Sequence, residues 1–439
     1  MRQLTDHIQR HAQNIPDKTA IVCGEESITY HELWQAVRLR ALNFDPDTNS
    51  VIVRASQSTD FLITYFAAHH AHTPIIPLEH DAPDSTLLRI ERTAHDNDIP
   101  PQVADILYTT GTTGQQKGTM ISHQAIIADA ENLIEAQVFC PDPTFVISGP
   151  LNHIGSLSKV WPTIIVGGTI VITEGIKDIN KFMQALSTAK GKVATFLVPA
   201  SIRILLQFAK EPLQSLAGKI DFIETGASPI PQADMETLCQ LLPDTRLYNT
   251  YASTETGIIA THNYNGGYCK AGCLGKPMKH SRLAISPDGH ILCQGLTIMT
   301  GYLGDTELTQ QVLRNDIIYT QDKGHIDTRG RLQLTGRTGD IINVGGYKIK
   351  PVEVEDAAKA HPTVADCICI AAPHPVLGTT LKLLVVTTDH APLNKKILAA
   401  HLLERLERHK VPLLYEQTKE RKRTYNGKLH RKHYITSNL

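Results

Sequence analysis

The sequence lacks a hydrophobic run long enough to cross a membrane, and it lacks an excess of charge of either sign. Gly167 and Gly168 interrupt its longest apolar run, residues 163–172, which is too short to span a bilayer. The opening residues, Met-Arg-Gln-Leu-Thr-Asp-His, contain no signal-peptide hydrophobic core. The formal net charge is −1, which gives no reason to expect nucleic acid as a partner. We therefore expect a cytoplasmic protein with no membrane span and no nucleic-acid partner.

The sequence also lacks the paired cysteines of a disulfide framework or a zinc site. Its 8 cysteines are spread along the chain, and Cys269 and Cys273 have no second pair at a matching spacing. Isolated cysteines are typical of reduced thiols in a cytosolic protein. The composition is 41% hydrophobic and 20% charged over 439 residues, which is enough for more than one folding unit and a sizeable core.

The first hundred residues alternate short apolar runs with helical patterns. A helical pattern over 59–72 lies between extended runs at 51–53 and 74–77. Such alternation predicts an α/β domain with a largely parallel sheet. Proline lacks the N–H that a central strand donates, so Pro74 and Pro77 favour an edge position for the second run.

The stretch 108–118, Tyr-Thr-Thr-Gly-Thr-Thr-Gly-Gln-Gln-Lys-Gly, organises the rest of the chain. It follows an apolar run at 104–108 that predicts a buried strand, and it precedes a helical pattern at 123–135. Glycines let the backbone approach an anion, while hydroxyls and an ammonium group complete a phosphate cradle. The Walker A pattern fails, because Gln116 stands where glycine is required and Gly118 where Ser or Thr is required.

This loop resembles the phosphate loop of the acyl-adenylate-forming superfamily, which includes acyl-CoA synthetases, peptide-synthetase adenylation domains and firefly luciferase. Gln116 stands where proline is usual in that loop, and the other positions match. The resemblance implies that the loop binds the phosphates of ATP. The residues implied are Thr109, Thr110, Gly111, Thr112, Thr113, Gly114 and Lys117.

Residues 221–228, Asp-Phe-Ile-Glu-Thr-Gly-Ala-Ser, end a predicted strand in small residues. Small residues at the carboxyl end of a strand leave room for a ligand over an open α/β sheet. The resemblance places adenine and the acyl group beside Gly226, Ala227 and Ser228. The alternative is a tight turn between a strand and a helix, with no ligand.

Residues 248–257, Tyr-Asn-Thr-Tyr-Ala-Ser-Thr-Glu-Thr-Gly, combine an aromatic ring, hydroxyls and a carboxylate. The ring of Tyr251 can stack on adenine, and the hydroxyl of Thr254 can bond a phosphate oxygen. The carboxylate of Glu255 can hold the Mg²⁺ that accompanies ATP, because magnesium prefers hard oxygen ligands. The superfamily pattern Tyr-Gly-x-Thr-Glu is matched with Ala252 in place of glycine.

Residues 150–155, Pro-Leu-Asn-His-Ile-Gly, resemble the superfamily's histidine motif at the acyl pocket. The resemblance implies a pocket role for His153, and a helix-capping role is the alternative. Amino-acid-activating members place an aspartate near this motif, whereas residues 150–161 contain none. The sequence therefore favours an aryl or fatty acyl acid over an amino acid.

Later motifs contain candidate residues for binding ribose and for a hinge between two domains. Asp322 can accept hydrogen bonds from both ribose hydroxyls, and Arg337 carries fixed donors suited to ribose or phosphate. The resemblance identifies Asp340 as the hinge between two domains. It also implies that Gly345 and Gly346 border the pantetheine tunnel of CoA ligases.

The last hundred residues predict a small α+β unit. Within its basic end, residues 427–431 read Gly-Lys-Leu-His-Arg and keep the superfamily's spacing. The resemblance implies that Lys428 is the catalytic lysine, carried on a mobile loop. The alternative is one more solvated lysine of the basic stretch 410–432.

Taken together, the motifs predict an α/β protein whose large N-terminal domain, 1–339, has doubly wound sheets plus a small β-barrel. A small mobile α+β C-terminal domain follows at 340–439. The resemblance implies ATP-dependent activation of a carboxylic acid to an acyl-adenylate, then transfer to CoA, with ATP, Mg²⁺ and CoA required. One alternative acceptor is the phosphopantetheine of an acyl carrier protein. Another is a non-catalytic nucleotide- or acyl-binding relative, which the unusual Gln116 and Gln321 favour.

Overall fold

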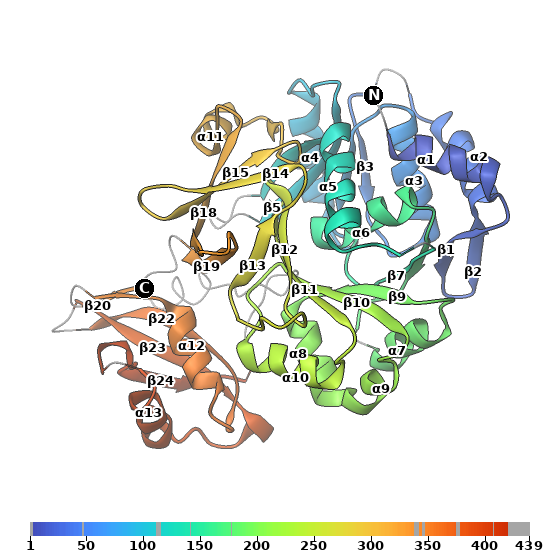
Figure 1. The fold of residues 1–439 in the computed structure, drawn as a ribbon. Coiled ribbons are helices and arrows are strands. Elements are labelled where there is room, and N and C mark those ends of the chain that lie inside the picture. Colours follow the sequence, from blue (N-terminus) through green and yellow to red (C-terminus); the bar gives the residue numbers. More distant parts are fainter. Residues whose placement is uncertain are drawn as a thin grey trace. The chain divides into compact units, whose positions relative to one another are not determined.

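The computed structural model divides into two units (Figure 1). It describes residues 3–45, 48–110, 116–140, 142–176, 178–337, 342–344, 347–374, 378–406 and 408–419. Unit 1 comprises Met1–Thr320 with Gly324–Leu334, and unit 2 comprises Gln321–Lys323 with Thr335–Leu439. None of the helices within the described ranges combines the length and the hydropathy that crossing a bilayer requires.

One sheet of unit 1 has the strand order β16-β6-β5-β4-β3. In chain order its elements are β3 (Val51–Arg54), α3 (Thr59–His70), β4 (Ile75–Leu78), α4 (Asp84–His95), β5 (Val103–Thr110), β6 (Gln116–Ser122) and β16 (Gly301–Tyr302). The strands β3, β4 and β5 are parallel, as the strand–helix alternation predicts. The predicted edge position of β4 is wrong, because β4 lies between β3 and β5. Its pairing with β5 is confined to Ile75 and Asp105, so Pro77 is not required to donate in that ladder.

The larger sheet has the order β14-β15-β18-β19-β13-β12-β11-β10-β9-β7-β8-β1-β2. Its parallel strands are β1 (Thr19–Cys23), β7 (Thr144–Ile147), β8 (Thr169–Ile172), β9 (Val193–Leu197), β10 (Ile220–Thr225) and β11 (Arg246–Ser253), and β2 (Glu26–Thr29) pairs with β1. Alternate residues face separate cores. Phe145 and Phe222 belong to one core, whereas Val146 and Ile223 belong to the other.

Helices cover both faces of this sheet (Figure 1), as the doubly wound fold class predicts. One group consists of α1 (Leu4–Asn14), α2 (Tyr30–Ala41), α3, α5 (His123–Ala136) and α6 (Ile154–Ile165), whose buried residues join the first core. The other group consists of α7 (Ile179–Thr188), α8 (Pro199–Phe208), α9 (Lys210–Ser215) and α10 (Gln232–Leu241), whose buried residues join the second core. The parallel part of the sheet is therefore buried between two helical layers.

Short antiparallel strands continue the larger sheet beyond β11, where the sequence predicts short strands separated by glycines. They are β12 (Gly257–Asn263), β13 (Cys273–Pro277), β14 (Ser281–Ile285), β15 (His290–Gly295), β17 (Leu313–Arg314), β18 (Ile317–Ile326) and β19 (Leu332–Arg337), with α11 (Thr306–Val312) before β17. Tyr251, Ile291 and Leu332 belong to a core of their own. This core packs the strands together close to the turn between β11 and β12.

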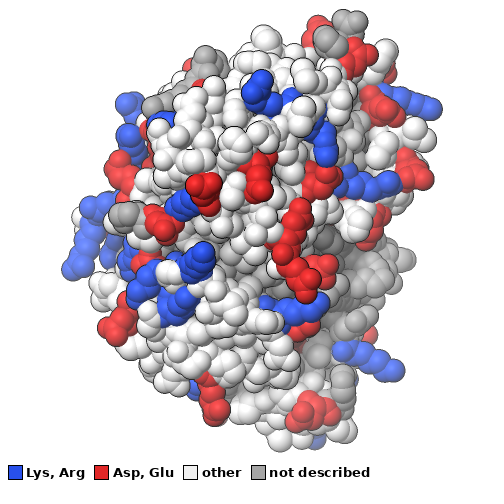
Figure 2. Space-filling model, turned by 90° about the vertical axis from the view of Figure 1, so that its right-hand side faces the viewer, with Lys and Arg blue, Asp and Glu red and all other residues white. Residues whose placement is uncertain are grey.

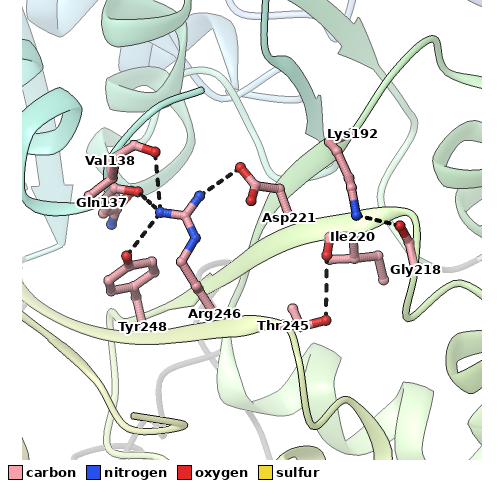
Figure 3. Close-up of polar contacts among 9 residues, drawn as sticks. All are labelled: Gln137, Val138, Lys192, Gly218, Ile220, Asp221, Thr245, Arg246 and Tyr248. Atoms are coloured by element: carbon pink, nitrogen blue, oxygen red, sulfur yellow. Dashed lines mark hydrogen bonds and ion pairs between the residues drawn. The ribbon is translucent and has the colours of Figure 1, made fainter. Parts of the chain in front are cut away.

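Arg246 ties the end of α5 to the starts of β10 and β11 (Figure 3). One guanidinium nitrogen donates to the Asp221 carboxylate at 2.7 Å, and the other donates to the carbonyls of Gln137 and Val138 and to the hydroxyl of Tyr248. This cluster lies at the opposite ends of the strands from the motifs at 226–228 and 254–255. We therefore assign it a structural role.

The described part of unit 2 contains a sheet with the order β22-β23-β24 and two α-helices. Its elements are β20 (Ile342–Val344), β21 (Tyr347–Ile349), α12 (Pro351–Lys359), β22 (Val364–His374), β23 (Gly378–Thr387), α13 (Lys395–Leu403) and β24 (Leu414–Gln417), with 3-10 turns at Thr388–His390 and Arg408–Lys410. Its core includes Val354, Cys367, Leu383 and Leu398. This is the small α+β unit that the sequence predicts.

Positive and negative side chains are interspersed on the face of the molecule shown in Figure 2. The net charge of −1 agrees with that pattern.

Candidate functional site

The predicted phosphate loop joins two antiparallel strands. The strands β5 and β6 pair from Val103 opposite Ser122 up to Thr110 opposite Gln116. The run predicted as a buried strand is thus confirmed, but a second strand, β6, precedes the predicted helix, now α5. Residues 118–121 of β6 are all buried, and the glycine and hydroxyl residues among them gave no strand pattern in the sequence. The hairpin fixes both ends of the loop on the five-stranded sheet.

Lys117 and Glu255 both lie next to Tyr302, a residue that the sequence motifs did not assign to the site. The Nζ of Lys117 lies 5.5 Å from the centre of the Tyr302 ring, and the Tyr302 hydroxyl donates to Glu255 Oε1 at 2.9 Å. Pairing of β16 with β6 places Tyr302 opposite Thr119. Three segments that are distant in sequence therefore converge beside the phosphate-loop hairpin.

Glu255 fits a magnesium ion that arrives with ATP. Within the described ranges, no group of three or more His, Cys, Asp or Glu side chains is arranged to hold a metal ion by itself. Mg²⁺ is usually bound by one or two carboxylates together with substrate phosphates. The Glu255 side chain is partly exposed and oriented by Tyr302, so one of its oxygens is available for such an ion.

The turn that carries Thr254 and Glu255 is pinned by α5. Asp129 Oδ1 accepts from the backbone N–H of Ile258 at 2.7 Å, and the Asn132 amide donates to the carbonyl of Ile258 at 2.9 Å. Burial raises the pKa of Asp129 well above its usual range, because an apolar surrounding disfavours the charged form of a carboxyl. The helix that follows the phosphate hairpin thus also positions the turn.

The residues after β10 lie against β11. A Cβ atom at Gly226 would approach the carbonyl oxygen of Thr250 to 3.0 Å, so glycine permits this close approach. Ala227 has φ of 67°, a left-handed conformation that costs a non-glycine residue free energy and is concentrated at functional sites. Ser228 is exposed. The ring of Tyr251 is 6% exposed and packs in a core, so its predicted stacking on adenine stays a prediction.

His153 is the N-cap of α6. Its Nδ1 accepts from the backbone N–H of Gly155 at 3.2 Å, so the capping role that the sequence left open is present. A Cβ atom at Gly155 would lie 3.1 Å from Phe196 Cε1 and 3.2 Å from His153 Nδ1. The histidine and the phenylalanine therefore flank one glycine at the start of the helix.

Asp322 and Arg337 come together in unit 2. The Nε of Arg337 lies 3.6 Å from Asp322 Oδ1, and both side chains are partly exposed. They stand on neighbouring strands, β18 and β19. A carboxylate and a guanidinium side by side suit the hydroxyls of ribose, so the two residues that the sequence proposed separately form one polar pair.

Several predicted site residues lie outside the described residues. They are Gly111, Thr112, Thr113, Gly114, Asp340, Gly345, Gly346 and Lys428. The backbone of Thr109 and Thr110 belongs to β5, but their side chains are not described. The assignments of all these residues rest on the sequence resemblance.

Two family models match the chain. The model of the AMP-binding enzyme matches residues 93–303, and the model of the AMP-binding enzyme C-terminal domain matches residues 353–428. Together they cover most of the sequence. The chain belongs to the AMP-binding enzyme family.

Relatives of this AMP-binding enzyme are named as CoA ligases. It is 27% identical to a feruloyl-CoA synthase of Amycolatopsis sp., over 96% of each chain. It is 29% identical to a long-chain-fatty-acid–CoA ligase of Bacillus subtilis, over 80% of this chain and 63% of that ligase. A match to a CoA ligase of Rhodococcus jostii likewise spans 61% of the relative. A 2-succinylbenzoate–CoA ligase of Staphylococcus aureus is 29% identical over 75% of this chain and 66% of that ligase.

Solved structures share the fold of this AMP-binding enzyme. ATP-bound MatB from Rhodopseudomonas palustris superposes with a TM-score of 0.86 at 21% identity, covering 99% of both chains. The o-succinylbenzoate CoA synthetase MenE from Bacillus subtilis, in complex with an acyl-adenylate intermediate, has a TM-score of 0.86 at 20% identity, covering 99% of this chain and 98% of that chain. The large unit with a smaller C-terminal unit is therefore the fold of adenylate-forming enzymes.

Proposed function

We propose that this AMP-binding enzyme activates a carboxylic acid with ATP to give an acyl-adenylate and then transfers the acyl group to CoA. The observation that carries the proposal is the meeting of Lys117, Tyr302 and Glu255 beside the phosphate-loop hairpin. The relatives support it, because their names are those of CoA ligases acting on several kinds of acid. The proposed domains are 1–339 and 340–439.

In the first half-reaction, a carboxylate oxygen of the acid attacks the α-phosphorus of ATP, and the bond from that phosphorus to the pyrophosphate oxygen breaks. Two anions are brought together, so positive charge must neutralise them. Lys428 would contact the carboxylate and the α-phosphate. Lys117 and Thr254, with the hydroxyls of Thr109, Thr110, Thr112 and Thr113, would hold the leaving pyrophosphate. Mg²⁺ bound by Glu255 would lower the charge of the phosphates.

The nucleoside would lie between the two motifs at the strand ends. Gly226, Ala227 and Ser228 leave backbone room for adenine beside Tyr251. Asp322 and Arg337 would hold the ribose, since one accepts from hydroxyls and the other donates to oxygens. His153 and Gly155 would border the acyl group.

In the second half-reaction, the sulfur of CoA attacks the acyl carbonyl and AMP leaves. Lys428 would first withdraw, by rotation of the C-terminal domain about Asp340. Gly345 and Gly346 would let the pantetheine arm pass close to the backbone. An aryl or a fatty acid is the proposed substrate class, and the feruloyl- and fatty-acid-specific names among the relatives support it.

Pyrophosphate release from ATP and Mg²⁺ tests the proposal across a panel of aryl, short-chain and long-chain acids, each with and without CoA. We expect release that depends on one class of acid and becomes faster with CoA. Release that CoA leaves unchanged but a phosphopantetheinyl carrier protein accelerates would move the acceptor to the carrier. Absence of pyrophosphate release with every acid of the panel, with ATP binding intact, would overturn the enzymatic proposal in favour of a non-catalytic relative.

A further inference from the structure

A buried ion pair joins the helix that begins at His153 to the strand that ends at Gly226. Lys159 of α6 donates to Glu224 Oε1 of β10 at 2.8 Å, and each side chain is 1% exposed. Removing two charges from water costs several kcal/mol per ion unless further hydrogen bonds satisfy them. A costly ion pair of this kind next to a proposed binding site is therefore expected to serve ligand binding in addition to the fold.

The pair is not fully satisfied by the protein. Glu224 Oε2 is buried and has no hydrogen-bond partner among the described residues. The Lys159 ammonium can donate three hydrogen bonds, and Glu224 is its one hydrogen-bonded partner in the described part of the chain. Burial raises the pKa of the nearby Asp129 well above its usual range, and the carboxylate that pairs with Lys159 is that of Glu224.

The pair lies next to the ring of Phe196. Lys159 Nζ is 5.1 Å from the ring centre, and pairing of β9 with β10 sets Phe196 directly beside Glu224. Cβ atoms at Gly155 and Gly226 would lie 3.1 and 3.6 Å from the two edges of the ring. The two glycines thus let the backbone pack against the edges of the ring, and Phe196 borders both these glycines of the proposed acyl site and the ion pair.

We propose that Lys159 and Glu224 form the far end of the acyl site and select a carboxylic acid with a hydroxyl group at the end remote from its carboxylate. A hydroxyl oxygen accepts from Lys159 and its hydrogen is donated to Glu224 Oε2, so one neutral group uses both unmet capacities. A second carboxylate would face the Glu224 charge. An alkyl end would leave the buried oxygen unsatisfied. The inference rests on the proposed acid activation and names its substrate class.

The first experiment uses the wild-type protein and sets of three acids matched in length: cinnamate with its para-hydroxy and para-carboxy forms, and octanoate with its terminal hydroxy and terminal carboxy forms. We expect the hydroxylated member of the preferred set to exceed both others in kcat/KM for pyrophosphate release by roughly tenfold to hundredfold. Equal or better activation of the unsubstituted acid would overturn the inference and leave the ligase function standing.

The second experiment changes the pair without leaving a lone buried charge. Lys159→Met with Glu224→Leu replaces it by apolar groups of similar volume, a change that buried ion pairs often tolerate. We expect the preference for the hydroxylated acid to disappear, with kcat/KM for the hydroxylated acid falling to about the value for the unsubstituted acid. Arg203→Met with Asp234→Leu, which removes the 3.0 Å pair between α8 and α10, is the control and should retain the preference.

Calorimetric binding of the same acids in the presence of AMP separates the two proposals. Absence of pyrophosphate release with preferential binding of the hydroxylated acid, lost in the double variant, would reject the ligase function and support the selection site. Equal binding of all three acids by the wild type would reject the selection site, whatever the activity.

Discussion

The hydroxyl of Tyr302 connects the metal-binding candidate Glu255 to the phosphate-loop lysine. Tyr302→Phe removes the 2.9 Å hydrogen bond to Glu255 and keeps the ring beside Lys117. A hydrogen bond to a charged group contributes about 1.5–3 kcal/mol, so we expect the KM for Mg·ATP to rise roughly tenfold or more with a smaller effect on kcat. Titration of Mg·ATP in the pyrophosphate assay measures this. Tyr319→Phe, at an exposed position, is the control, and an unchanged KM in Tyr302→Phe contradicts the role.

Gly257 ends the turn that carries Glu255 and has φ of 69°. A Cβ atom there would lie 2.6 Å from the carbonyl oxygen of Thr297 and 2.7 Å from Asp129 Oδ1. Gly24 has φ of 61° but open space around its Cα. Gly24→Ala should therefore lower the free energy of unfolding by about 1–2 kcal/mol, and Gly257→Ala by clearly more. Urea unfolding of both variants compares the two costs, and equal losses would exclude a steric role at Gly257.

At the scale of elements, α5 links the phosphate hairpin to the turn at 254–257. Asp129→Asn keeps an oxygen for the Ile258 N–H, whereas Asp129→Ala leaves that buried donor unsatisfied. We expect Asp129→Ala to lose about 1–3 kcal/mol of stability and to raise the KM for Mg·ATP. We expect Asp129→Asn to show neither loss, because the amide oxygen still accepts from the Ile258 N–H.

The raised pKa of Asp129 also predicts how the stability of Asp129→Asn relative to wild type depends on pH. Burial raises the pKa of the folded carboxyl, so the folded protein keeps this proton to a higher pH than the unfolded chain, in which the carboxyl ionises above its usual pKa of about 4. Wild-type stability therefore falls as pH rises above about 4. The stability of Asp129→Asn relative to wild type should therefore increase from about pH 4 upwards. A pH-independent difference would mean that Asp129 is ionised in the folded protein.

Local motifs were predictable and contacts between motifs were not. The strand before the phosphate loop, the helix at 123–136 and the α/β alternation follow from residues adjacent in sequence, whereas the strand β6 that completes the hairpin was not predicted. The position of β4 was mispredicted. A proline in the sequence shows that a backbone N–H donor is missing, but it does not show which neighbouring strand would have accepted that hydrogen bond. Tyr302 was missed because its partners lie on other strands, and a lone Gly-Tyr pair carries no signal of them. Asp129 was missed because an acid inside a helical pattern is usually solvated.

At the scale of the whole molecule, His123 should make the fold sensitive to acid. The side chain is 4% exposed, and burial together with His69, His72 and the N-terminus lowers its pKa to about 3. The unfolded imidazole gains a proton below about pH 6.5 while the folded one does not, so stability is lost as pH falls by up to about 1.4 kcal/mol per unit. Urea unfolding between about pH 7 and pH 5 should show this slope in wild type. The slope should be reduced in His123→Gln and kept in a variant of the exposed His31, and a slope unchanged in His123→Gln would contradict the assignment.

In the proposed mechanism the two half-reactions use different positions of the C-terminal domain, and Lys428 acts in the first of them alone. If Lys428 neutralises charge only while the acyl-adenylate forms, Lys428→Ala should lower acid-dependent pyrophosphate release by about a hundredfold or more. Thioester formation from supplied acyl-AMP and CoA should remain within a few-fold of wild type, because the lysine has withdrawn in that step. Lys419→Ala, at an exposed position in the same basic stretch, is the control for loss of one positive charge and should leave both steps intact. Equal loss of both steps in Lys428→Ala would mean that the residue supports the fold of the C-terminal unit or binds CoA. The separate roles of the two half-reactions would then have to be carried by other residues.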